Sequence, residues 1–328
     1  MNVRLVKITE GKTKLFVPDL LFYKKPGNAP VFYNPAMEKE RNNAVQILRI
    51  YLKKKAKVAD ILCGTGARAV RYANECGLIT YANDISPTAI EVTRKNAKEN
   101  SVTVRTSILE ANEFLRKHKK KFDAIDIDPF GSPLKFLKNA GDSLRKRGLL
   151  CITATDIGTL DGYFPKKCIE RYGIITAQNS FPSELGIRNL LFIIQKKTKK
   201  TLDPIGLFAN AHYLRVYVKC DLGKKYVGYI AYCECERRKI CSSPKSQKCK
   251  CGKKMKIFGP TWIGKIQGTE IPYYDIHVLA SKYKKKCPSI DQLIEKLKAF
   301  GYLAERSMFC GYGLKTNAPF EKILEHFS

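Results

Sequence analysis

Asp128 lies in a short segment, Asp126-Ile-Asp128-Pro129-Phe130, that follows an apolar stretch beginning near Phe122. Pro129 fixes φ and has no amide hydrogen, which lets the carboxylate and carbonyl of Asp128 face an incoming group. Phe130 supplies a flat apolar face on which a base can stack. The exocyclic amine of a base is a poor nucleophile, and a fixed acceptor localises its lone pair and takes up the developing positive charge. The segment therefore suits methyl transfer to such an amine, although Asp-Pro and Gly-Ser-Pro also form ordinary turns before helices.

A glycine turn indicates where a nucleotide cofactor binds. The run from Val58 to Gly66 is predicted to be a buried strand that ends in this turn, where Gly64 and Gly66 permit positive φ and a close approach of ligand to backbone. Eighteen residues after Gly66 the next apolar run ends at Asp84, whose carboxylate can bind the two hydroxyls of a ribose. Gly64, Gly66 and Ala69 also match the dinucleotide fingerprint, so these glycines do not separate NAD from S-adenosylmethionine. The Asp-Pro-Phe segment favours S-adenosylmethionine.

Short apolar runs alternate with helical patterns from about Lys57 to Ile194, which predicts a doubly wound, mostly parallel α/β sheet. Together with the cofactor favoured by the Asp-Pro-Phe segment, this sheet is expected to be of the class I S-adenosylmethionine-dependent methyltransferase type. The predicted strands are KVADILC, TYAND, DAIDIDPF, GLLCITAT and NLLFIIQ, and the predicted helices are Ala67–Cys76, Pro87–Glu99 and Pro133–Leu144. In such sheets ligands bind beyond the carboxyl ends of the strands, where Gly64, Asp84 and Asp128 are expected.

Three regions are predicted along the chain. Residues 1–45, rich in Pro, Asn and aromatic residues, form an arm or lid on the catalytic domain, or else a surface extension. Residues 46–221 form the methyltransferase domain, which ends after the basic linker QKKTKKTLDP. Residues 222–328 mix strands, a cysteine cluster and a helical segment near Ser289–Phe300, and are expected to be a smaller α+β domain that binds RNA.

The charge of the chain favours a polyanionic partner. Sixty Lys and Arg face 30 Asp and Glu, a formal net charge of +30, and phosphate backbones are the usual partner of such an excess. A lysine-rich proteome adapted to heat or salt gives the same excess without nucleic-acid binding. The start MNVRLVKITEG has no apolar signal core, and no run of 18 apolar residues occurs, so a cytoplasmic protein without a membrane partner is expected. No obligate protein partner is evident.

A series of motifs runs through nearly the whole chain, and their order and intervals together are specific. The motifs are Glu10-Gly11, Val17-Pro18, Val31-Phe-Tyr-Asn-Pro-x-Met37 with Arg41, Asp60-x-x-x-Gly-Thr-Gly-x-Arg68, Asn83-Asp84, Ala111-Asn112, Asp128-Pro-Phe-Gly-Ser-Pro133, Thr155-Asp156, Tyr163-x-Pro165-Lys166, Glu184-x-Gly186-x-Arg188, Gly259-Pro260-x-Trp262-x-Gly264 and Gly313-Leu-Lys315-Thr-Asn-Ala318-Pro319. With this set the chain resembles the tRNA guanine-N2 dimethyltransferase family of archaea and eukaryotes, which modifies guanosine 26 at the junction of the D and anticodon stems.

The resemblance implies S-adenosylmethionine as the cofactor, and it assigns residues to its parts. Asp84 is implied to hold the ribose hydroxyls, and Glu110 with Ala111 to line the adenine. Arg41 and Arg68 are implied to approach the methionine carboxylate. On the residues alone, Arg68 is also consistent with a solvated helix face.

The resemblance further implies methylation of the exocyclic N2 amine of guanosine 26 in tRNA, to N2,N2-dimethylguanosine. Asp128 is implied to accept a hydrogen bond from the target amine, with Phe32 and Phe130 on the two faces of the guanine. Core packing of the amino-terminal arm is the alternative explanation for Phe32. The residues themselves do not decide whether one or two methyl groups are added.

Five of the 12 cysteines lie within the nineteen residues from Cys233 to Cys251. Cys233-Glu-Cys235 and Cys249-Lys-Cys251 resemble the two halves of a zinc ribbon. The family normally spaces each pair as C-x-x-C, whereas both pairs here are C-x-C, and Cys241 is an alternative ligand. A structural zinc ion on Cys233, Cys235, Cys249 and Cys251 is predicted, with free thiols or oxidised pairs as the alternatives.

Other functions fit some of these residues. An amino-methyltransferase that acts on another base in rRNA or DNA would use the same Asp-Pro-Phe turn. A non-catalytic RNA-binding protein would explain the charge but not the intact Gly64, Gly66, Asp84 and Asp128. A dehydrogenase would explain the glycines, but neither the Asp128 segment nor the charge.

Overall fold

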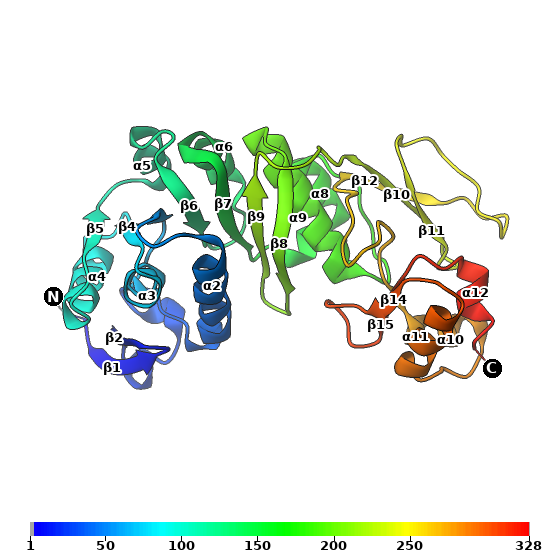
Figure 1. The fold of residues 1–328 in the computed structure, drawn as a ribbon, viewed down its shortest axis with the longest axis horizontal. Coiled ribbons are helices and arrows are strands. Elements are labelled where there is room, and N and C mark those ends of the chain that lie inside the picture. The colour runs from blue at the N-terminus through cyan, green and yellow to red at the C-terminus, as the bar shows by residue number, and fades with distance from the viewer. Residues whose placement is uncertain (1–2, 328) are drawn as a thin grey trace. The chain divides into compact units, whose positions relative to one another are not determined.

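The computed structural model describes residues 3–327, and it contains a seven-stranded sheet whose strands lie between residues 57 and 220 (Figure 1). The sheet has the order β5-β4-β3-β6-β7-β9-β8. Its strands are β3 (Lys57–Asp60), β4 (Ile79–Asn83), β5 (Val104–Ser107), β6 (Phe122–Ile127), β7 (Leu144–Ala154), β8 (Leu202–Ala209) and β9 (Leu214–Cys220). Neighbouring strands from β5 to β7 pair in parallel. The predicted doubly wound α/β fold is confirmed.

Helices connect the parallel strands. They are α3 (Ala67–Cys76), α4 (Pro87–Glu99), α5 (Ala111–Lys117) and α6 (Leu134–Ser143), and α2 (Glu38–Tyr51) precedes the first of these strands. The helix α3 packs against both α2 and α4, and α5 packs against α6. Because parallel crossovers are right-handed, these two groups cover opposite faces of the sheet. The strand order reverses between β3 and β6, and that reversal is where sheets of this class bind ligands.

Local signals explain where two of the connecting helices begin. Gly66 precedes α3 with φ 72°, a left-handed conformation that favours glycine, and Gly77 ends the same helix with φ 65°. Ser86 caps α4 by accepting a hydrogen bond from the amide of Ala89, and Pro87 occupies the first turn, where its missing amide hydrogen costs nothing. The helices predicted over these ranges are confirmed.

The strand predicted over NLLFIIQ is wrong, because these residues lie in the helix α9 (Pro182–Thr198). Every residue of α9 from Glu184 to Gln195 is buried. A helix buried on all sides shows no polar stripe, so its apolar run is indistinguishable by periodicity from a buried strand.

The chain divides into two compact units. The first unit contains the residues up to Thr153 together with Lys197–Gly206 and Val216–Gly223. The second unit contains Ala154–Lys196, Leu207–Arg215 and the residues from Lys224 onward. The boundaries predicted at residues 45/46 and 221/222 stay predictions.

In the first unit, an amino-terminal hairpin packs on α3 and α4. It consists of the antiparallel strands β1 (Leu5–Glu10) and β2 (Thr13–Pro18) and is followed by α1 (Leu20–Tyr23) and the 3-10 turns η1 (Pro26–Asn28) and η2 (Pro35–Met37). Asn96 of α4 binds both the amide and the carbonyl of Phe16, at 2.6 and 3.1 Å. Leu15 and Val17 pack against Val70 of α3. The amino-terminal segment is therefore ordered on this unit.

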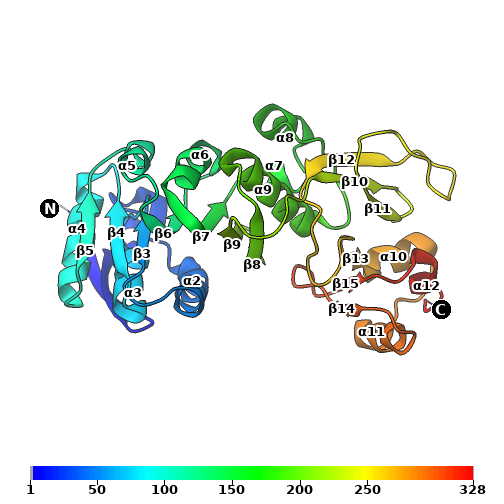
Figure 2. The same ribbon diagram turned by 45° about the horizontal axis from the view of Figure 1, so that its top comes forward.

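The second unit combines helices with two small sheets (Figure 2). One sheet has the order β11-β10-β12, with β10 (Gly228–Tyr232), β11 (Arg238–Cys241) and β12 (Lys256–Thr261). The other has the order β13-β15-β14, with β13 (Tyr274–Asp275), β14 (Ala304–Arg306) and β15 (Gly313–Thr316). The remaining helices are α7 (Ile157–Leu160), α8 (Pro165–Tyr172), α10 (Ile276–Tyr283), α11 (Ile290–Ala299) and α12 (Phe320–Leu324). The helix predicted near Ser289–Phe300 is confirmed as α11.

Several motif residues of the second half of the chain form its interior. Glu184 and Arg188 of α9 are fully buried and form an ion pair of 2.7 Å, and buried Lys315 joins Glu184 at 3.0 Å. Arg188 also donates to the carbonyls of Trp262 and Gly264, both at 3.1 Å. Burial lowers the pKa of Lys315 to about 8. These residues hold the second unit together.

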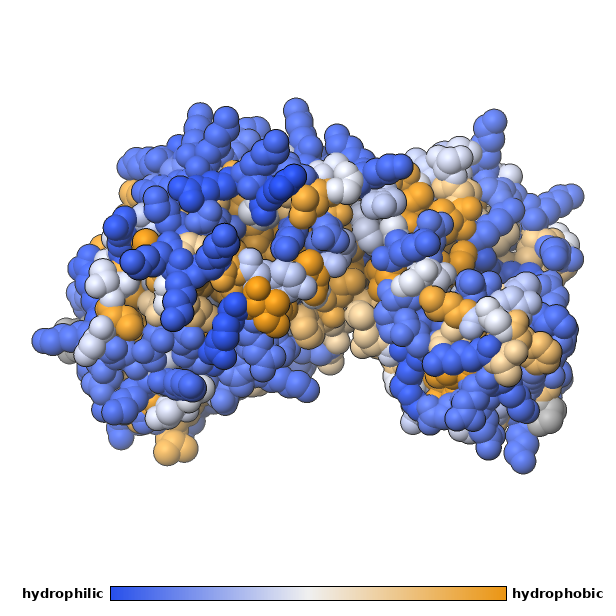
Figure 3. Space-filling model, viewed as in Figure 1, coloured by the Kyte–Doolittle hydropathy of each residue, from blue (hydrophilic) through white to orange (hydrophobic). Residues whose placement is uncertain are grey.

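Hydrophilic residues cover most of the face seen in Figure 3, with hydrophobic residues in small groups. Within residues 3–327, no helix is both long and apolar enough to cross a bilayer.

Candidate active site

Asp128 directly follows β6, and a buried arginine of α3 holds its carboxylate. Arg68 donates from Nη2 and Nε to Oδ2 of Asp128, at 2.6 and 3.2 Å. Arg68 also pairs with buried Glu40 of α2, which in turn accepts from the hydroxyl of Tyr217 at 2.7 Å. The side chain of Asp128 is 26% exposed, whereas its partners are buried. The arrangement therefore presents a fixed carboxylate to solvent at the edge of the sheet.

Two exposed phenyl rings lie together at this site. Phe130 is 78% exposed and Phe32 is 38% exposed, so neither is a core residue. Their ring centroids are 4.7 Å apart and their planes are nearly perpendicular, at 88°. The edge-to-face contact brings the two predicted rings together, but a base can enter between them only if the rings separate. Core packing therefore does not explain why the amino-terminal arm carries Phe32.

The glycine turn after β3 lies against the end of β4. Asp84 follows β4 and accepts hydrogen bonds from the amides of Gly64 and Ser86, at 2.9 and 3.0 Å. Gly64 and Gly66 have φ of 53° and 72°. A Cβ at Gly64 would lie 2.9 Å from the carbonyl oxygen of Phe32, and one at Gly66 would lie 2.5 Å from Thr93. Both glycines are therefore required by conformation and by space.

The ends of four neighbouring parallel strands contribute to this edge. Glu110 caps α5, three residues beyond β5, and accepts from the amides of Asn112 and Glu113 at 2.9 and 3.1 Å. Ala111 is the first residue of α5 and is buried. Together with the glycine turn, Asp84 and Asp128, these residues occupy the carboxyl ends of β3 to β6. The sheet topology thus gathers the predicted residues that follow these strands, whereas Arg68 reaches the site from α3 and Phe32 from the amino-terminal segment; Arg41 is not among them.

Arg41 has a different environment, because all three nitrogens of its guanidinium donate inside the first unit. Nε and Nη2 bind the two carboxylate oxygens of Glu10 at 2.7 and 2.6 Å, and Nη1 binds the carbonyl of Asn34 at 3.1 Å. Glu10 also accepts from Arg71 at 2.7 Å and from Tyr33 at 2.8 Å. The buried network ties the hairpin to α2 and α3. A contact from Arg41 to the methionine carboxylate stays a prediction.

We expect Glu10→Gln to lower the free energy of unfolding near neutral pH by about 3–5 kcal/mol, because the buried guanidinium of Arg41 loses its counter-charge and that of Arg71 keeps only Glu75. Burial raises the pKa of Glu10, but Arg41, Tyr33 and Arg71 together hold it below the usual 4.5. A lowered folded pKa contributes stability that is fully present above the unfolded value and is lost as pH falls through the folded value.

Urea unfolding between pH 7 and pH 3 tests this expectation. The difference between wild type and Glu10→Gln should shrink as the pH falls below about 4.5. Glu91→Gln is the matched control, because Glu91 is an exposed glutamate of α4. If Glu10→Gln and this control have the same free energy of unfolding at pH 7, the network does not anchor the hairpin.

The sequence-based prediction missed the acidic residues beneath the site. Asp60 ends β3 and Asp126 lies in β6, and both are buried. Tyr72 donates to Asp126 at 2.6 Å, whereas Oδ2 of Asp60 is buried and has no hydrogen-bond partner in the described chain. Burial and the neighbouring Asp126 raise the pKa of Asp60 well above its ordinary value. The signal available in the sequence was an acid inside each of two otherwise apolar strands.

Four cysteines of the second unit form a candidate metal centre. The Sγ atoms of Cys233, Cys235, Cys249 and Cys251 all lie within 4.8 Å of one another. The pairs Cys233–Cys251 and Cys235–Cys249 are 3.5 and 3.4 Å apart. Four thiolates around zinc at about 2.3 Å lie roughly 3.8 Å apart, whereas a disulfide is about 2.0 Å long. The group fits a tetrahedral zinc ion, and Cys241 is outside it, with its thiol 3.6 Å from the carbonyl of Tyr229.

Two equivalent turns explain how the short C-x-C spacing is accommodated. In the first, the amide of Cys233 donates to the carbonyl of Arg237 at 2.9 Å, and Glu236 has φ 71°. In the second, the amide of Cys249 donates to the carbonyl of Lys253 at 2.9 Å, and Gly252 has φ 86°. The left-handed residue after each pair closes the turn and points both thiols inward.

We expect the full-length protein, reconstituted with zinc, to bind one zinc ion per chain. Cys251→Ser should lose most of this zinc, because three thiolates hold the ion less tightly than four. Cys241→Ser is the matched control and should keep it. Zinc content measured by mass spectrometry after gel filtration decides between them. Equal zinc loss in both variants, or a wild type that binds none, would contradict the assignment.

Comparisons with known proteins place the chain in a family. The family model described as N2,N2-dimethylguanosine tRNA methyltransferase matches residues 11–272 and 268–328. The tRNA (guanine(26)-N(2))-dimethyltransferase of Pyrobaculum aerophilum is 34% identical over 98% of this chain and 96% of its own length. The corresponding protein of Methanobrevibacter smithii is 31% identical over 98% of this chain and 97% of its own length.

A solved structure agrees with the sequence relatives. The structure of Trm1 from Pyrococcus horikoshii with S-adenosyl-L-methionine has a TM-score of 0.86 and 26% identity, and the match covers 99% of this chain and 100% of that one. The Aquifex aeolicus relative is 33% identical over 97% of this chain and 94% of its own length, and is described as a tRNA (guanine(26)-N(2)/guanine(27)-N(2))-dimethyltransferase. The chain therefore belongs to the N2,N2-dimethylguanosine tRNA methyltransferase family.

Proposed function

We propose that the protein transfers methyl groups from S-adenosylmethionine to the exocyclic N2 amine of guanosine 26 in tRNA, to give N2,N2-dimethylguanosine. The observation that carries this proposal is the carboxylate of Asp128, fixed by buried Arg68 beside the exposed rings of Phe32 and Phe130. The glycine turn and Asp84 lie at the same edge of the sheet. Family membership and the net charge of +30 support RNA as the substrate.

The residues at the edge fit S-adenosylmethionine. The carboxylate of Asp84 is held by two backbone amides next to the glycine turn and suits a ribose diol. The buried, unpartnered Oδ2 of Asp60 suits a cationic donor, because an unsatisfied buried acceptor costs about 1–3 kcal/mol. Glu110 and Ala111 are assigned to the adenine. Of the two arginines assigned to the methionine carboxylate, Arg68 lies beside the site.

The reaction then depends mainly on alignment of the N2 amine with the methyl group and on one hydrogen-bond acceptor, Asp128. The cofactor supplies a methyl group on a sulfonium, which is the electrophile. Phe32 and Phe130 stack on the guanine once it has left its helix, a step that costs a few kcal/mol. Asp128 accepts a hydrogen bond from the N2 amine, localises its lone pair and stabilises the positive charge that develops there. As the N–C bond forms and the S–C bond breaks, the amine proton would pass along this hydrogen bond to Asp128, whose partly exposed carboxylate would release it to water. A singly methylated amine keeps one N–H for Asp128, so the same geometry serves a second round.

The region from residue 222 onward is assigned to binding the tRNA backbone. In the basic run near α10, Lys282 and Lys285 donate to backbone carbonyls of the second unit. Lys284 and Lys286 are exposed, and no carboxylate of the described chain lies within ion-pair distance of them. Around the cysteine group, Lys250, Lys253 and Lys256 lie 3.5–3.6 Å from Glu321 or Glu234, whereas Lys245, Lys248 and Lys254 are exposed without such a pair among the described residues. The exposed lysines without a carboxylate partner are therefore the candidates for phosphate contacts.

Mass spectrometry of an unmodified tRNA transcript tests the function after incubation with the protein and labelled cofactor. The expected product carries two methyl groups on guanosine 26, and a transcript with adenosine at that position should stay unmodified. Methylation of a different base, or of both transcripts equally, would favour an amino-methyltransferase with another target. Binding of S-adenosylmethionine without any transfer would favour a non-catalytic RNA-binding role.

A further inference from the structure

Three basic segments occur at the amino ends of three neighbouring strands. Lys53-Lys54-Lys55 precedes β3, Lys119-Lys120-Lys121 precedes β6, and Arg145-Lys146-Arg147 opens β7. In the sheet β3 pairs with β6 and β6 pairs with β7, both in parallel, so their amino ends share one edge. These nine residues are called the basic edge. It lies at the end of the sheet opposite to Asp84 and Asp128.

The sequence gives no reason for these segments to meet, because more than 60 residues separate the first from the second. The other two parallel strands, β4 and β5, are preceded by Gly77-Leu78 and Val102-Thr103 instead. Lysine is frequent throughout the chain, but here the charges are concentrated on three adjacent strands. The clustering is therefore a property of the fold.

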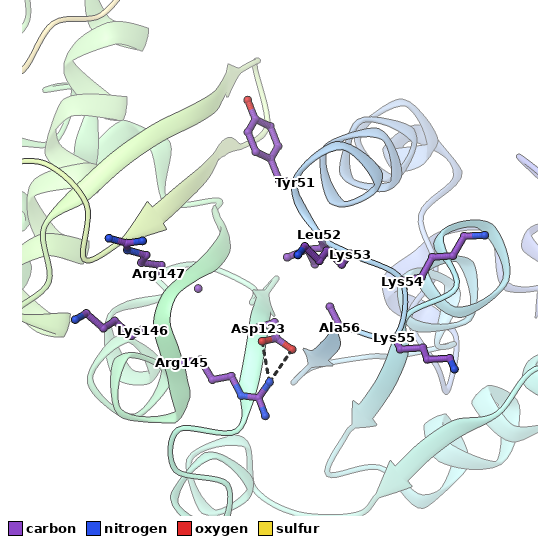
Figure 4. Close-up of a pocket in the computed structure, with 11 residues that line it drawn as sticks. Tyr51, Leu52, Lys53, Lys54, Lys55, Ala56, Asp123, Arg145, Lys146 and Arg147 are labelled. Atoms are coloured by element: carbon purple, nitrogen blue, oxygen red, sulfur yellow. Dashed lines mark hydrogen bonds and ion pairs between the residues drawn. The ribbon is translucent and has the colours of Figure 1, made fainter.

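A pocket of about 370 Å³ lies at the basic edge (Figure 4). Its lining includes Lys53-Lys54-Lys55, Arg145-Lys146-Arg147 and Asp123. Asp123 is already matched, because it accepts from Arg145 at 3.0 and 3.3 Å and from the amide of Lys57 at 2.7 Å. All six basic residues of the pocket are exposed. Among the residues that the structure describes, no carboxylate forms an ion pair with Lys53, Lys54, Lys55, Lys146 or Arg147. The local excess of positive charge is therefore not neutralised by the described residues 3–327.

The directions of these side chains indicate which kind of anion the basic edge can bind. In Figure 4 the charged ends of Lys54 and Lys55 point away from those of Lys146 and Arg147, and they do not converge on one point inside the pocket. A single phosphate would meet one or two of them. Three strands about 4.8 Å apart span roughly 10 Å at this edge. A nucleic-acid duplex carries about one charge per 1.7 Å of its axis, so an RNA crossing this edge would meet several phosphates.

We propose that the basic edge binds the phosphate backbone of the substrate RNA, at a distance from the methylated nucleotide. The proposal rests on the proposed function, which makes the substrate a folded RNA. Because the edge is at the opposite end of the strands from Asp128, its contacts contribute to RNA affinity and not to the methyl-transfer step. Phosphate contacts of this kind position an RNA without reading its sequence.

The test compares two full-length variants that each lose three charges. The edge variant is Lys53→Gln/Lys54→Gln/Lys146→Gln, and the matched control is Lys12→Gln/Lys14→Gln/Lys98→Gln; all six lysines are exposed residues of the first unit. For the edge variant we expect Kd for a tRNA transcript to rise by about tenfold or more near 0.15 M salt, and the log–log salt slope to fall by about 2. The kcat at saturating tRNA should stay at the wild-type value. The control should change the slope by less than about 1.

Several outcomes would overturn the proposal. They are an edge variant that binds tRNA as tightly as wild type, a control that loses as much affinity, and an edge variant that loses kcat at unchanged Kd. Inorganic phosphate that binds wild type but not the edge variant, with equal tRNA affinity in the two proteins, would show a site for a small anion instead. Methyl transfer by wild type reports separately on the proposed function, so failure of the edge proposal leaves that function standing.

Discussion

Asp128→Ala is expected to slow methyl transfer about 10²–10³-fold while the affinity for S-adenosylmethionine stays within a few-fold. The alanine removes the acceptor that stabilises the developing charge on the amine, which is worth about 3–4 kcal/mol in the transition state. Arg68 keeps its pairing with Glu40 after the change, so the fold should persist. Single-turnover transfer to a tRNA transcript gives the rate, and calorimetry gives the cofactor affinity.

Asp128→Asn is the informative companion variant. Asparagine keeps the size of the side chain and one acceptor oxygen, but it loses the negative charge that faces Arg68 and the amine. Its rate should therefore lie between those of wild type and the alanine variant. An alanine variant with more than about a third of the wild-type rate would remove Asp128 from the reaction, because the loss would be far below that of a transition-state acceptor.

The gathering of the candidate site residues at one end of the sheet was predictable, because they follow strands whose apolar character is clear. Asp84 and Asp128 come directly after buried strands and Gly64 lies in the turn that follows β3, and parallel strands place such residues together. Glu40 was not predictable, because one acid in an amphipathic helix has no special signal. The pairing of Arg41 with Glu10 joins residues 31 apart, and neither composition nor spacing indicates it. Contacts between distant segments are fixed by packing, which a single sequence does not display.

The core of the second unit is also formed by contacts between distant segments, which the sequence alone did not indicate. Phe181 and Leu185, which precede the basic linker, pack against Ile230 and Phe258, which follow it. The linker composition indicated a boundary near residue 222, but the contacts of α9 are with the later strands. A fragment that ends at residue 221 would expose this cluster, so RNA binding is better tested with point variants of the whole chain. The four cysteines, by contrast, were predictable, because paired thiols close in sequence have few other uses.

Asp84→Ala is expected to weaken binding of S-adenosylmethionine by at least about 10²-fold. Two charge-assisted hydrogen bonds to the ribose diol are lost, at roughly 1.5–3 kcal/mol each. The same carboxylate also accepts from the amides of Gly64 and Ser86, so its removal frees the glycine turn as well. Calorimetric titration with S-adenosylmethionine measures the affinity, and titration of wild type with NAD should show no binding. Glu91→Ala, an exposed carboxylate in the same unit, is the control.

Asp84→Ala and Asp128→Ala are distinguished by how their rates of methyl transfer respond to cofactor concentration. Asp84 is assigned to the cofactor and does not touch the amine, so the rate of Asp84→Ala should return toward wild type when S-adenosylmethionine is raised far above its weakened Kd. Asp128→Ala should stay slow at any cofactor concentration, because the missing group acts on the amine. Unchanged cofactor affinity in Asp84→Ala would mean that the diol is held elsewhere, and Glu110 at the end of β5 would be the next carboxylate to test. A rate for Asp84→Ala that saturating cofactor does not restore would instead indicate that the glycine turn, once freed, also misplaces the methyl group.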